Sequence, residues 1–117
     1  MDVKSREEII KFAQKLNSTN LSPLRSGNIS LKAQNNNEEG FLITPSGKKY
    51  DSLKADDIVF VSLEGRYDEK GLQPSSEWRF HKDIYLKKAD AKAIVHAQSP
   101  HSTAVSAHNK DIPAFHY

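Results

Sequence analysis

Cysteine is absent from the 117 residues, which excludes disulfide bonds and thiolate metal ligands and agrees with a reducing compartment. Long apolar runs are missing as well, since no stretch approaches the roughly 20 residues that span a bilayer. The first ten residues, MDVKSREEII, carry acidic side chains where a secretory signal would have an apolar centre. We therefore expect a protein that is neither exported nor embedded in a membrane, with the cytoplasm as its location.

An excess of one charge sign is lacking too. The chain has 17 Lys and Arg against 15 Asp and Glu, and the formal net charge is only +2. Because the signs are mixed along the chain, no basic field is available to gather a nucleic acid, and we expect no nucleic-acid partner. The hydrophobic share of 37% is enough for one modest core, and the length fits a single domain over residues 1–117.

The spacing of the apolar residues predicts helices on both sides of a short run of strands. Ser5 and Glu8 match a capping box, and the helical spacing of apolar residues after them extends to about residues 17–20. A second helix is predicted over residues 77–88. Alternating or continuous apolar residues predict strands. The predicted strands cover residues 29–33, 41–44, 58–63 and 93–95.

The segment after residue 95 carries two further expectations. Ser99 as N-cap and Pro100 at the first helical position predict a third helix through about His108. The apolar stretch at residues 112–117 is typical of the start of another strand.

His96 and Gln98 stand two residues apart at the end of an apolar strand, so their side chains project to the same face. Two such side chains can share one ligand, and imidazole is a common metal ligand. The alternative is that a single histidine at a strand edge is simply a partly buried polar residue. The other histidines have weaker cases as site residues; they are His81, His101, His108 and His116.

Ser75, Ser76 and Glu77 stand where a loop becomes a helix. Such a terminus offers free backbone N–H groups and a positive dipole end to an anion, so a phosphate would fit there. The alternative is that one serine only caps the helix, while Glu77 in the first turn offsets the helix dipole.

Two glycine-containing pairs flank predicted strands: Gly27-Asn28 before one and Ser46-Gly47 after another. Glycine lets the backbone approach a ligand closely, and the small polar side chains can donate hydrogen bonds. Taken singly, each pair is also compatible with an ordinary turn.

These pieces occur together in one order, and the order carries a resemblance. The segments are SGNIS at 26–30, LITPSG at 42–47, PSSEWRFH at 74–81, AIVHAQSPHSTA at 93–104 and IPAFHY at 112–117. Over almost its whole length the chain resembles the class II aldolase/adducin family, most closely the L-fuculose-phosphate aldolase branch. The most specific feature is PSSEWRFH followed by the histidine strand.

The resemblance implies a fold and a set of roles. The fold is α/β, a central β-sheet flanked by helices in three layers, and the enzymes are usually homotetramers with active sites where subunits meet. Glu77 would be the acid/base and would also approach the metal, and His96 would be a zinc ligand. Zinc would act as a Lewis acid on the substrate ketone. The residues implied for the substrate phosphate are Gly27, Asn28, Ser46, Gly47, Ser75 and Ser76.

Two departures from the family pattern weaken the implied metal site. The family strand reads His-x-His, and here Gln98 replaces the second histidine. An amide oxygen is a poorer ligand for zinc, although it suits a harder divalent cation. The third family histidine lies beyond residue 117. We therefore expect weak or absent zinc and a fold that is incomplete at its C-terminus, as in a truncated gene product, a fragment or a partially cloned chain.

Two functional hypotheses follow from the resemblance. The first is reversible cleavage of a ketose 1-phosphate, such as L-fuculose 1-phosphate, to dihydroxyacetone phosphate and an aldehyde; related members epimerise or dehydrate sugar phosphates instead. The second is a catalytically impaired or non-enzymatic adducin-like module for binding and assembly. Gln98 favours the second, while Ser75, Ser76 and Glu77 favour the first.

Overall fold

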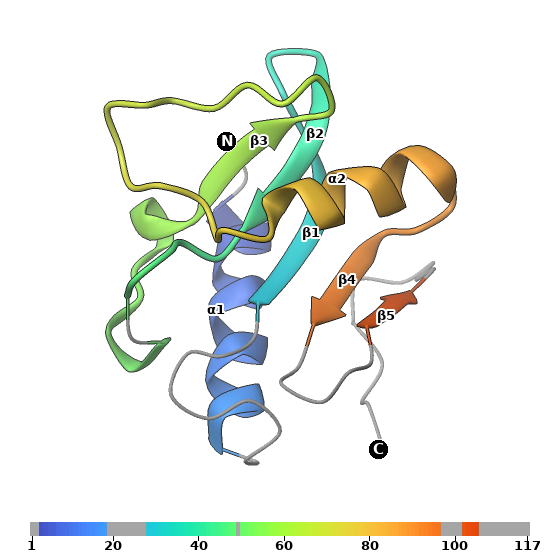
Figure 1. Cartoon of the computed structure of the whole chain (residues 1–117). Helices are drawn as coiled ribbons and strands as arrows, with labels where there is room; N and C mark the ends of the chain where they lie inside the picture. Colours follow the sequence, from blue (N-terminus) through green and yellow to red (C-terminus); the bar gives the residue numbers. More distant parts are fainter. Residues whose placement is uncertain (1–2, 19–27, 49, 97–101, 106–117) are drawn as a thin grey trace.

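The computed structural model describes residues 3–18, 28–48, 50–96 and 102–105. Its strands form one five-stranded antiparallel sheet in the order β3-β2-β1-β4-β5, with α1 on one face and α2 on the other (Figure 1). The three-layer α/β fold expected from the sequence is confirmed. In chain order the elements are α1 (Val3–Ser18), β1 (Asn28–Asn35), β2 (Glu38–Ile43), the 3₁₀ turns η2 (Tyr50–Ser52) and η3 (Ala55–Asp57), β3 (Val59–Ser62), α2 (Trp78–Lys87), β4 (Ala93–His96) and β5 (Ser102–Val105).

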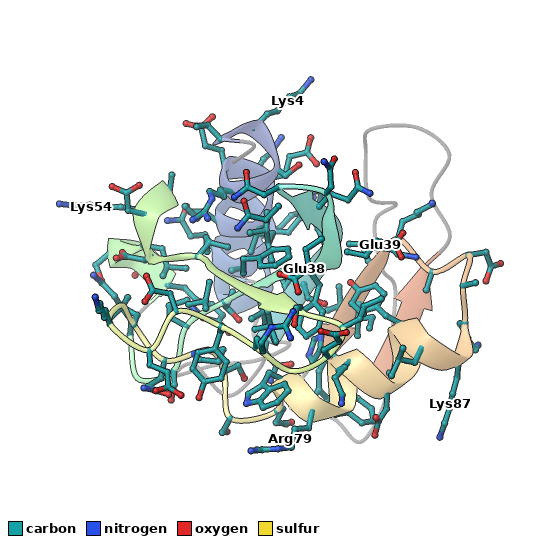
Figure 2. All side chains as sticks on the ribbon, turned by 90° about the horizontal axis from the view of Figure 1, so that it is seen from above. Lys4, Glu38, Glu39, Lys54, Arg79 and Lys87 are labelled. Atoms are coloured by element: carbon teal, nitrogen blue, oxygen red, sulfur yellow. The ribbon has the colours of Figure 1, made fainter. Side chains whose placement is uncertain are left out.

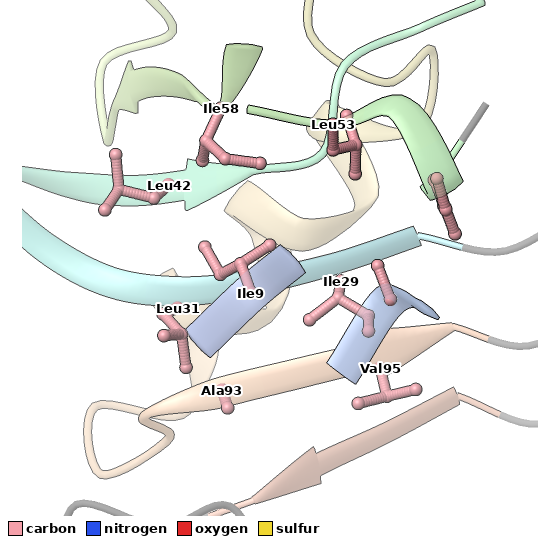
Figure 3. Packing of buried hydrophobic residues seen from close by; sticks show 10 residues of the cluster. Ile9, Ile29, Leu31, Leu42, Leu53, Ile58, Ala93 and Val95 are labelled. Atoms are coloured by element: carbon pink, nitrogen blue, oxygen red, sulfur yellow. The ribbon is translucent and has the colours of Figure 1, made fainter. Parts of the chain in front are cut away.

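The α1 face of the sheet is packed with apolar side chains (Figure 3). Ile9 and Ala13 of α1 are fully buried because their four-residue spacing places them on one side of the helix. Each fully buried Ile, Leu or Val contributes roughly 1.5–3 kcal/mol to folding. The buried members of this cluster, called here the α1-face core, are Ile9, Ala13, Ile29, Leu31, Leu42, Tyr50, Leu53, Ile58, Ala93 and Val95.

The α2 face carries a second apolar cluster. Phe41 and Ile43 point to this face because they alternate with Leu42 along β2. The ring of Tyr85, from α2, stacks on Phe41 with centroids 5.3 Å apart. The buried members of this cluster, called here the α2-face core, are Phe41, Ile43, Val59, Val61, Tyr85, Ala91 and Ile94.

A tight hairpin joins β1 to β2, and its two linking residues, Asn36 and Asn37, have φ values of 52° and 67°. Asparagine tolerates this left-handed backbone, and two such residues match the twist of the flanking strands. Gly40 in β2 has a different reason: a Cβ there would lie 2.2 Å from the carbonyl oxygen of Val61. Only glycine therefore lets β3 pair closely with β2 at this point.

Charged side chains lie at the surface of the molecule. Lys4, Lys54, Arg79 and Lys87 point away from the ribbon in different directions (Figure 2). The guanidinium of Arg79 sits 4.4 Å from the ring centroid of Trp78, so its stem covers an aromatic surface. These four labelled positive charges are therefore dispersed over the part of the surface that the structure describes. Among the described helices, neither α1 nor α2 has the length and apolar character needed to cross a membrane.

Two sequence-based expectations about helices were wrong. The first helix begins at Val3, so Ser5 lies inside it and is not its N-cap. The third helix, expected to run through about His108, is contradicted at residues 102–105, which form β5. β5 pairs antiparallel with β4 and supplies partners for the backbone of β4, and its Thr103 is β-branched, which favours a strand. The expected start of that helix, Ser99-Pro100, and the strand expected at 112–117 lie outside the described residues.

Candidate active site

One edge of the sheet collects the ends of three strands. Because neighbouring strands are antiparallel, the start of β1 lies beside the ends of β2 and β4. Asn28, the first residue of β1, is directly opposite His96, the last residue of β4. Thr44 follows β2 and is fully buried, and its backbone N–H donates to the carbonyl of Ile29 at 3.1 Å. Residues from positions 28, 44 and 96 therefore meet at one place.

The loop before α2 is fastened to this same edge. The N–H of Ser75 donates to the carbonyl of Thr44 at 2.9 Å, and the N–H of Ser46 donates to the carbonyl of Gln73 at the same distance. A bridge between Pro45 and Pro74 continues this pairing. The segments LITPSG and PSSEWRFH, some thirty positions apart in the sequence, thus lie side by side, and the start of α2 is held over the strand ends.

The serine loops differ in exposure. Ser75 is buried, and its hydroxyl accepts a 3.3 Å hydrogen bond from the N–H of Glu77, which is itself the N-cap residue of α2, so this serine orders the turn before the helix and is not its cap. Ser76, Ser46 and Gly47 are exposed. Gly47 has a φ of 76°, and a Cβ there would meet nothing within 4 Å. The backbone conformation accounts for glycine at position 47, and the open space beside it leaves room for a ligand.

Glu77 and His96 come together across the start of α2 and the end of β4. The Oε1 atom of Glu77 lies 2.6 Å from Nδ1 of His96. This nitrogen is buried, and the contact does not have the alignment of a hydrogen bond. Glu77 occupies the N-cap position of α2, but its side chain makes no capping hydrogen bond. A carboxylate and an imidazole, two side chains of the types that bind metal ions, therefore converge on one point at the strand ends.

Tyr50 and Thr44 border this region on the α1 side. Tyr50 is buried, and burial raises the pKa of its phenol. A hydrogen bond with Thr44 opposes the rise, and the negative charge of Glu77 adds to it. The hydroxyl of Thr44 also accepts the N–H of Ile29 at 3.4 Å. Hydrogen bonds between Thr44 and Ile29 thus hold the end of β2 against the start of β1, beneath the loops.

A buried polar chain runs under Asn28 on the α2 face. His81 is fully buried, and its Nε2 is hydrogen-bonded to Oδ1 of Asn28 while its Nδ1 is 2.7 Å from the hydroxyl of Ser30. That hydroxyl is 2.8 Å from the hydroxyl of Tyr85. Burial, and then the positive charge of His96, lower the pKa of His81 to about 3. His81 is therefore a neutral ring at physiological pH.

His81 lies in the segment PSSEWRFH but had only a weak case as a site residue from the sequence. The available signal was its spacing: His81 is one helical turn after Glu77, so both lie on the same side of α2. The partners Asn28 and Ser30 lie more than fifty residues earlier, and only the fold brings them to His81.

Two residues assigned by sequence, Gly27 and Gln98, lie outside the described residues, as do His101, His108 and His116. Within residues 3–18, 28–48, 50–96 and 102–105, no three acidic or histidine side chains cluster as a metal site would require. Glu77 and His96 lie together as a pair.

A groove of about 570 Å³ lies away from this edge, between the start of α1, the β1–β2 hairpin and the loop after β3. Asn35 on its wall is seven residues along β1 from Asn28, which separates the two places by roughly 23 Å of strand. None of the site residues named above lines it. We place the candidate site at the strand ends because ligand-type side chains converge there.

The chain is similar to known proteins in sequence and in fold. The sequence model of the class II aldolase and adducin N-terminal domain matches residues 7–117. An L-fuculose phosphate aldolase from Escherichia coli (strain K12) is 41% identical over 114 residues, covering 97% of this chain and 51% of that relative. A 5-methylthioribulose-1-phosphate/5-deoxyribulose-1-phosphate aldolase from Rhodospirillum rubrum is 40% identical, covering 96% of this chain and 48% of that relative.

The solved structures agree. An L-fuculose 1-phosphate aldolase superposes with a TM-score of 0.73 at 34% identity, covering 83% of this chain and 45% of that chain. The Klebsiella pneumoniae protein YgbL, titled a putative aldolase/epimerase/decarboxylase, also gives 0.73 at 33% identity, covering 86% and 47%. The chain spans about half the length of the curated relatives it matches. With the family model matching nearly the whole sequence, the chain belongs to the class II aldolase and adducin N-terminal domain family.

Proposed function

We propose that the protein is a metal-assisted aldolase that reversibly cleaves a ketose 1-phosphate, such as L-fuculose 1-phosphate, to dihydroxyacetone phosphate and an aldehyde. The substrates of the similar aldolases support this substrate class, because both L-fuculose 1-phosphate and 5-methylthioribulose 1-phosphate are ketose 1-phosphates. The observation that carries the proposal is the convergence of Glu77 and His96, 2.6 Å apart, beside the serine loop at the start of α2.

The phosphate is proposed to bind at the loops that meet over the strand ends. The start of α2 supplies a positive dipole end, and the exposed hydroxyls of Ser46 and Ser76 can donate to phosphate oxygens. Ser75 and Asn28 are buried below them, so their side chains would bind the part of the anion that enters deepest. Gly27 and Gly47 complete the proposed set by allowing the backbone to approach the phosphate.

The divalent cation is proposed to be held by Glu77 and His96, with Gln98 as a doubtful third ligand in place of the family histidine. A carboxylate oxygen and a buried imidazole nitrogen with no hydrogen bond are ligand types that fit zinc. An amide oxygen in the same set favours a harder cation such as magnesium or manganese. When bound, the cation supplies Lewis-acid polarisation of the substrate carbonyl.

Glu77 is proposed to carry the proton. As the carbon–carbon bond breaks, the hydroxyl on the leaving carbon becomes the aldehyde carbonyl and releases its proton to water. The electron pair of the broken bond stays on the carbon next to the carbonyl of dihydroxyacetone phosphate, and the Glu77 carboxyl delivers a proton to that carbon and regains one from water. In the reverse direction the carboxylate removes the same proton. The half-buried side chain of Glu77 is restricted by its contact with His96, so it is held near a substrate bound at the serine loop.

The second candidate is a non-catalytic, adducin-like assembly module, and Gln98 is the feature that favours it. The two candidates differ in metal affinity. We expect the purified full-length protein to retain less than one equivalent of zinc after dialysis, and Gln98→His to raise the retained zinc toward one equivalent. Gln34→His, which adds a histidine at an exposed site far along β1, is the matched control and should change nothing. A full equivalent in the unaltered protein would show that Gln98 does not weaken the site.

Cleavage itself is tested with the full-length protein and a panel of ketose 1-phosphates that includes L-fuculose 1-phosphate. We expect release of dihydroxyacetone phosphate that stops on treatment with a chelator and returns when a divalent cation is added. If the protein, loaded in turn with zinc, manganese and magnesium, releases none from any member of the panel, the assembly module becomes the better account.

A homotetramer in the cytoplasm is the proposed context, with no membrane or nucleic-acid partner. The dispersed charges and the absence of cysteine support the location and the lack of a nucleic-acid partner. Light scattering on the full-length protein measures the assembly directly, and a mass near four subunits is the expected result.

A further inference from the structure

The proposed chemistry leaves one buried group unused. His81 is fully buried on the α2 face, and both of its ring nitrogens make hydrogen bonds, one to Asn28 and one to Ser30. Tyr85 continues the chain from Ser30. Four polar side chains in succession within an apolar layer are costly to bury unless each donor finds an acceptor.

The donors and acceptors follow from the chemistry of each group. The amide oxygen of Asn28 can only accept, so Nε2 of His81 carries the proton. A neutral ring then has a lone pair at Nδ1, and this nitrogen accepts from the hydroxyl of Ser30. The hydroxyl of Ser30 accepts in turn from the phenol of Tyr85. The chain therefore runs in one direction, from Tyr85 to Asn28.

The direction of the hydrogen bonds fixes the orientation of the Asn28 side-chain amide. An asparagine that rotates freely presents either its oxygen or its NH₂ group to a ligand, and the oxygen repels an anion. With the oxygen bound to the ring, the NH₂ group is the half of the amide that is left to donate. Asn28 lies opposite His96 in the sheet, at the strand ends where the anion is proposed to bind.

We propose that His81 is a positioning residue that, through its hydrogen bonds to Ser30 and Asn28, fixes the Asn28 amide so that it offers its NH₂ group to the substrate phosphate. The inference rests on the proposed function, which puts the phosphate beside Asn28. The geometry supports it, because one ring nitrogen of His81 contacts Asn28 and the other contacts Ser30. The benefit is a donor that is already oriented before the anion arrives.

The tautomer is tested first, in the unaltered full-length protein. Nitrogen-15 NMR of the histidine rings distinguishes the two neutral tautomers and the cation, and His81→Phe identifies the His81 signals by their loss. We expect a neutral ring protonated at Nε2 at neutral pH. A proton at Nδ1, or on both nitrogens, would overturn the proposal, because the ring would then turn the Asn28 amide the other way or lose its polarity.

The second test measures the dissociation constant of inorganic phosphate by titration calorimetry. Losing one oriented hydrogen bond to a charged group weakens binding about tenfold or more, so Asn28→Ala and His81→Phe should each show this loss. Tyr85→Phe leaves both ring hydrogen bonds of His81 in place and should change the constant less than about twofold. His81→Gln, whose amide can still donate toward Asn28, should recover part of the affinity.

The double variant Asn28→Ala with His81→Phe separates positioning from a general structural role. If His81 acts through Asn28, the double variant binds phosphate no more weakly than Asn28→Ala alone, because there is no amide left to orient. Additive losses would overturn the proposal. So would unchanged affinity in folded His81→Phe when Asn28→Ala is weakened, an outcome that leaves the proposed function standing. Absence of phosphate binding in the unaltered protein would instead remove the proposed function itself.

Discussion

The two faces of strand β1 have opposite chemistry. Ile29 and Leu31 point toward α1 and join the largely apolar α1-face core, whereas Asn28 and Ser30 point toward α2 and bind His81. All four side chains are buried, so exposure does not explain the difference. The polar pair lies at the end of the strand where Glu77 and His96 meet, and the apolar pair faces a helix that contributes none of the candidate site residues.

This contrast shows how a small sheet combines stability with a binding site. The α1 face gains stability from apolar contacts, which do not depend on pH. The α2 face gives up part of that stability to bury hydrogen-bonded groups, which fix the directions of donors. Perturbing one face should therefore change stability alone, while perturbing the other should change stability, its pH dependence and ligand binding together.

The largest expected effect on stability comes from the α1 face. Ile9→Ala removes a fully buried side chain from the α1-face core and leaves a cavity, which costs about 2–5 kcal/mol of the free energy of unfolding. Val3→Ala on the same helix is the matched control, since Val3 is 57% exposed, and should cost under about 0.5 kcal/mol. Urea titration measures both. Weaker phosphate binding by folded Ile9→Ala would break the separation between the two faces.

A pH effect is expected from the α2 face. The unfolded chain protonates His81 near its ordinary pKa of 6.5, whereas the folded chain does so only near 3. Between these values the unfolded state binds more protons than the folded state. The contribution of His81 to the free energy of unfolding is therefore fully present above pH 6.5 and falls as the pH drops toward 3. The fall attributable to His81 is up to about 1.4 kcal/mol per pH unit within that window.

The measurement compares urea titrations of the unaltered protein and His81→Phe at several pH values. The two proteins differ only at His81, so the difference between their stabilities reports on this ring. The stability advantage of the unaltered protein should shrink as the pH falls below about 6. Parallel curves would mean that burial does not depress the pKa of His81, and the contrast in pH dependence between the faces would be lost.

The smallest of these effects concerns the far end of the buried chain. Tyr85→Phe keeps the ring that stacks on Phe41 and removes only the hydroxyl bound to Ser30. The expected cost is about 1 kcal/mol, the net value of one hydrogen bond. Thermal unfolding at neutral pH is sufficient to measure it. A cost as large as that of Ile9→Ala would show that the hydroxyl supports much more of the α2 face than one hydrogen bond.

Much of the fold could be predicted because its signals are local. The alternation Ile29, Leu31, Ala33 predicted β1, and the apolar run at 41–44 predicted the end of β2. The prediction of a third helix was wrong for the same reason. Ser99 and Pro100 are local signals for a helix start, but residues 102–105 pair with the edge of β4, and this tertiary interaction outweighs the local preference.

The candidate site also has some features that the local sequence predicts and others that depend on the fold. Ser75, Ser76 and Glu77 could be singled out because a helix start has a recognisable sequence, and His96 because it ends an apolar strand. The contact between Glu77 and His96, and the chain from Tyr85 through Ser30 and His81 to Asn28, depend on the register of β1 against β4. Register is set by packing across the whole sheet, so the sequence alone did not indicate these partners.

The central claim is that the carboxylate of Glu77 performs the proton transfer at a pocket whose phosphate-binding groups are separate from it. Glu77→Gln in the full-length protein, with Glu39→Gln at the exposed far end of β2 as matched control, tests it in one pair of assays. We predict that Glu77→Gln lowers kcat for ketose 1-phosphate cleavage at least about 100-fold and leaves the dissociation constant of inorganic phosphate within about twofold, while Glu39→Gln changes neither. Unaltered turnover in Glu77→Gln would contradict the account.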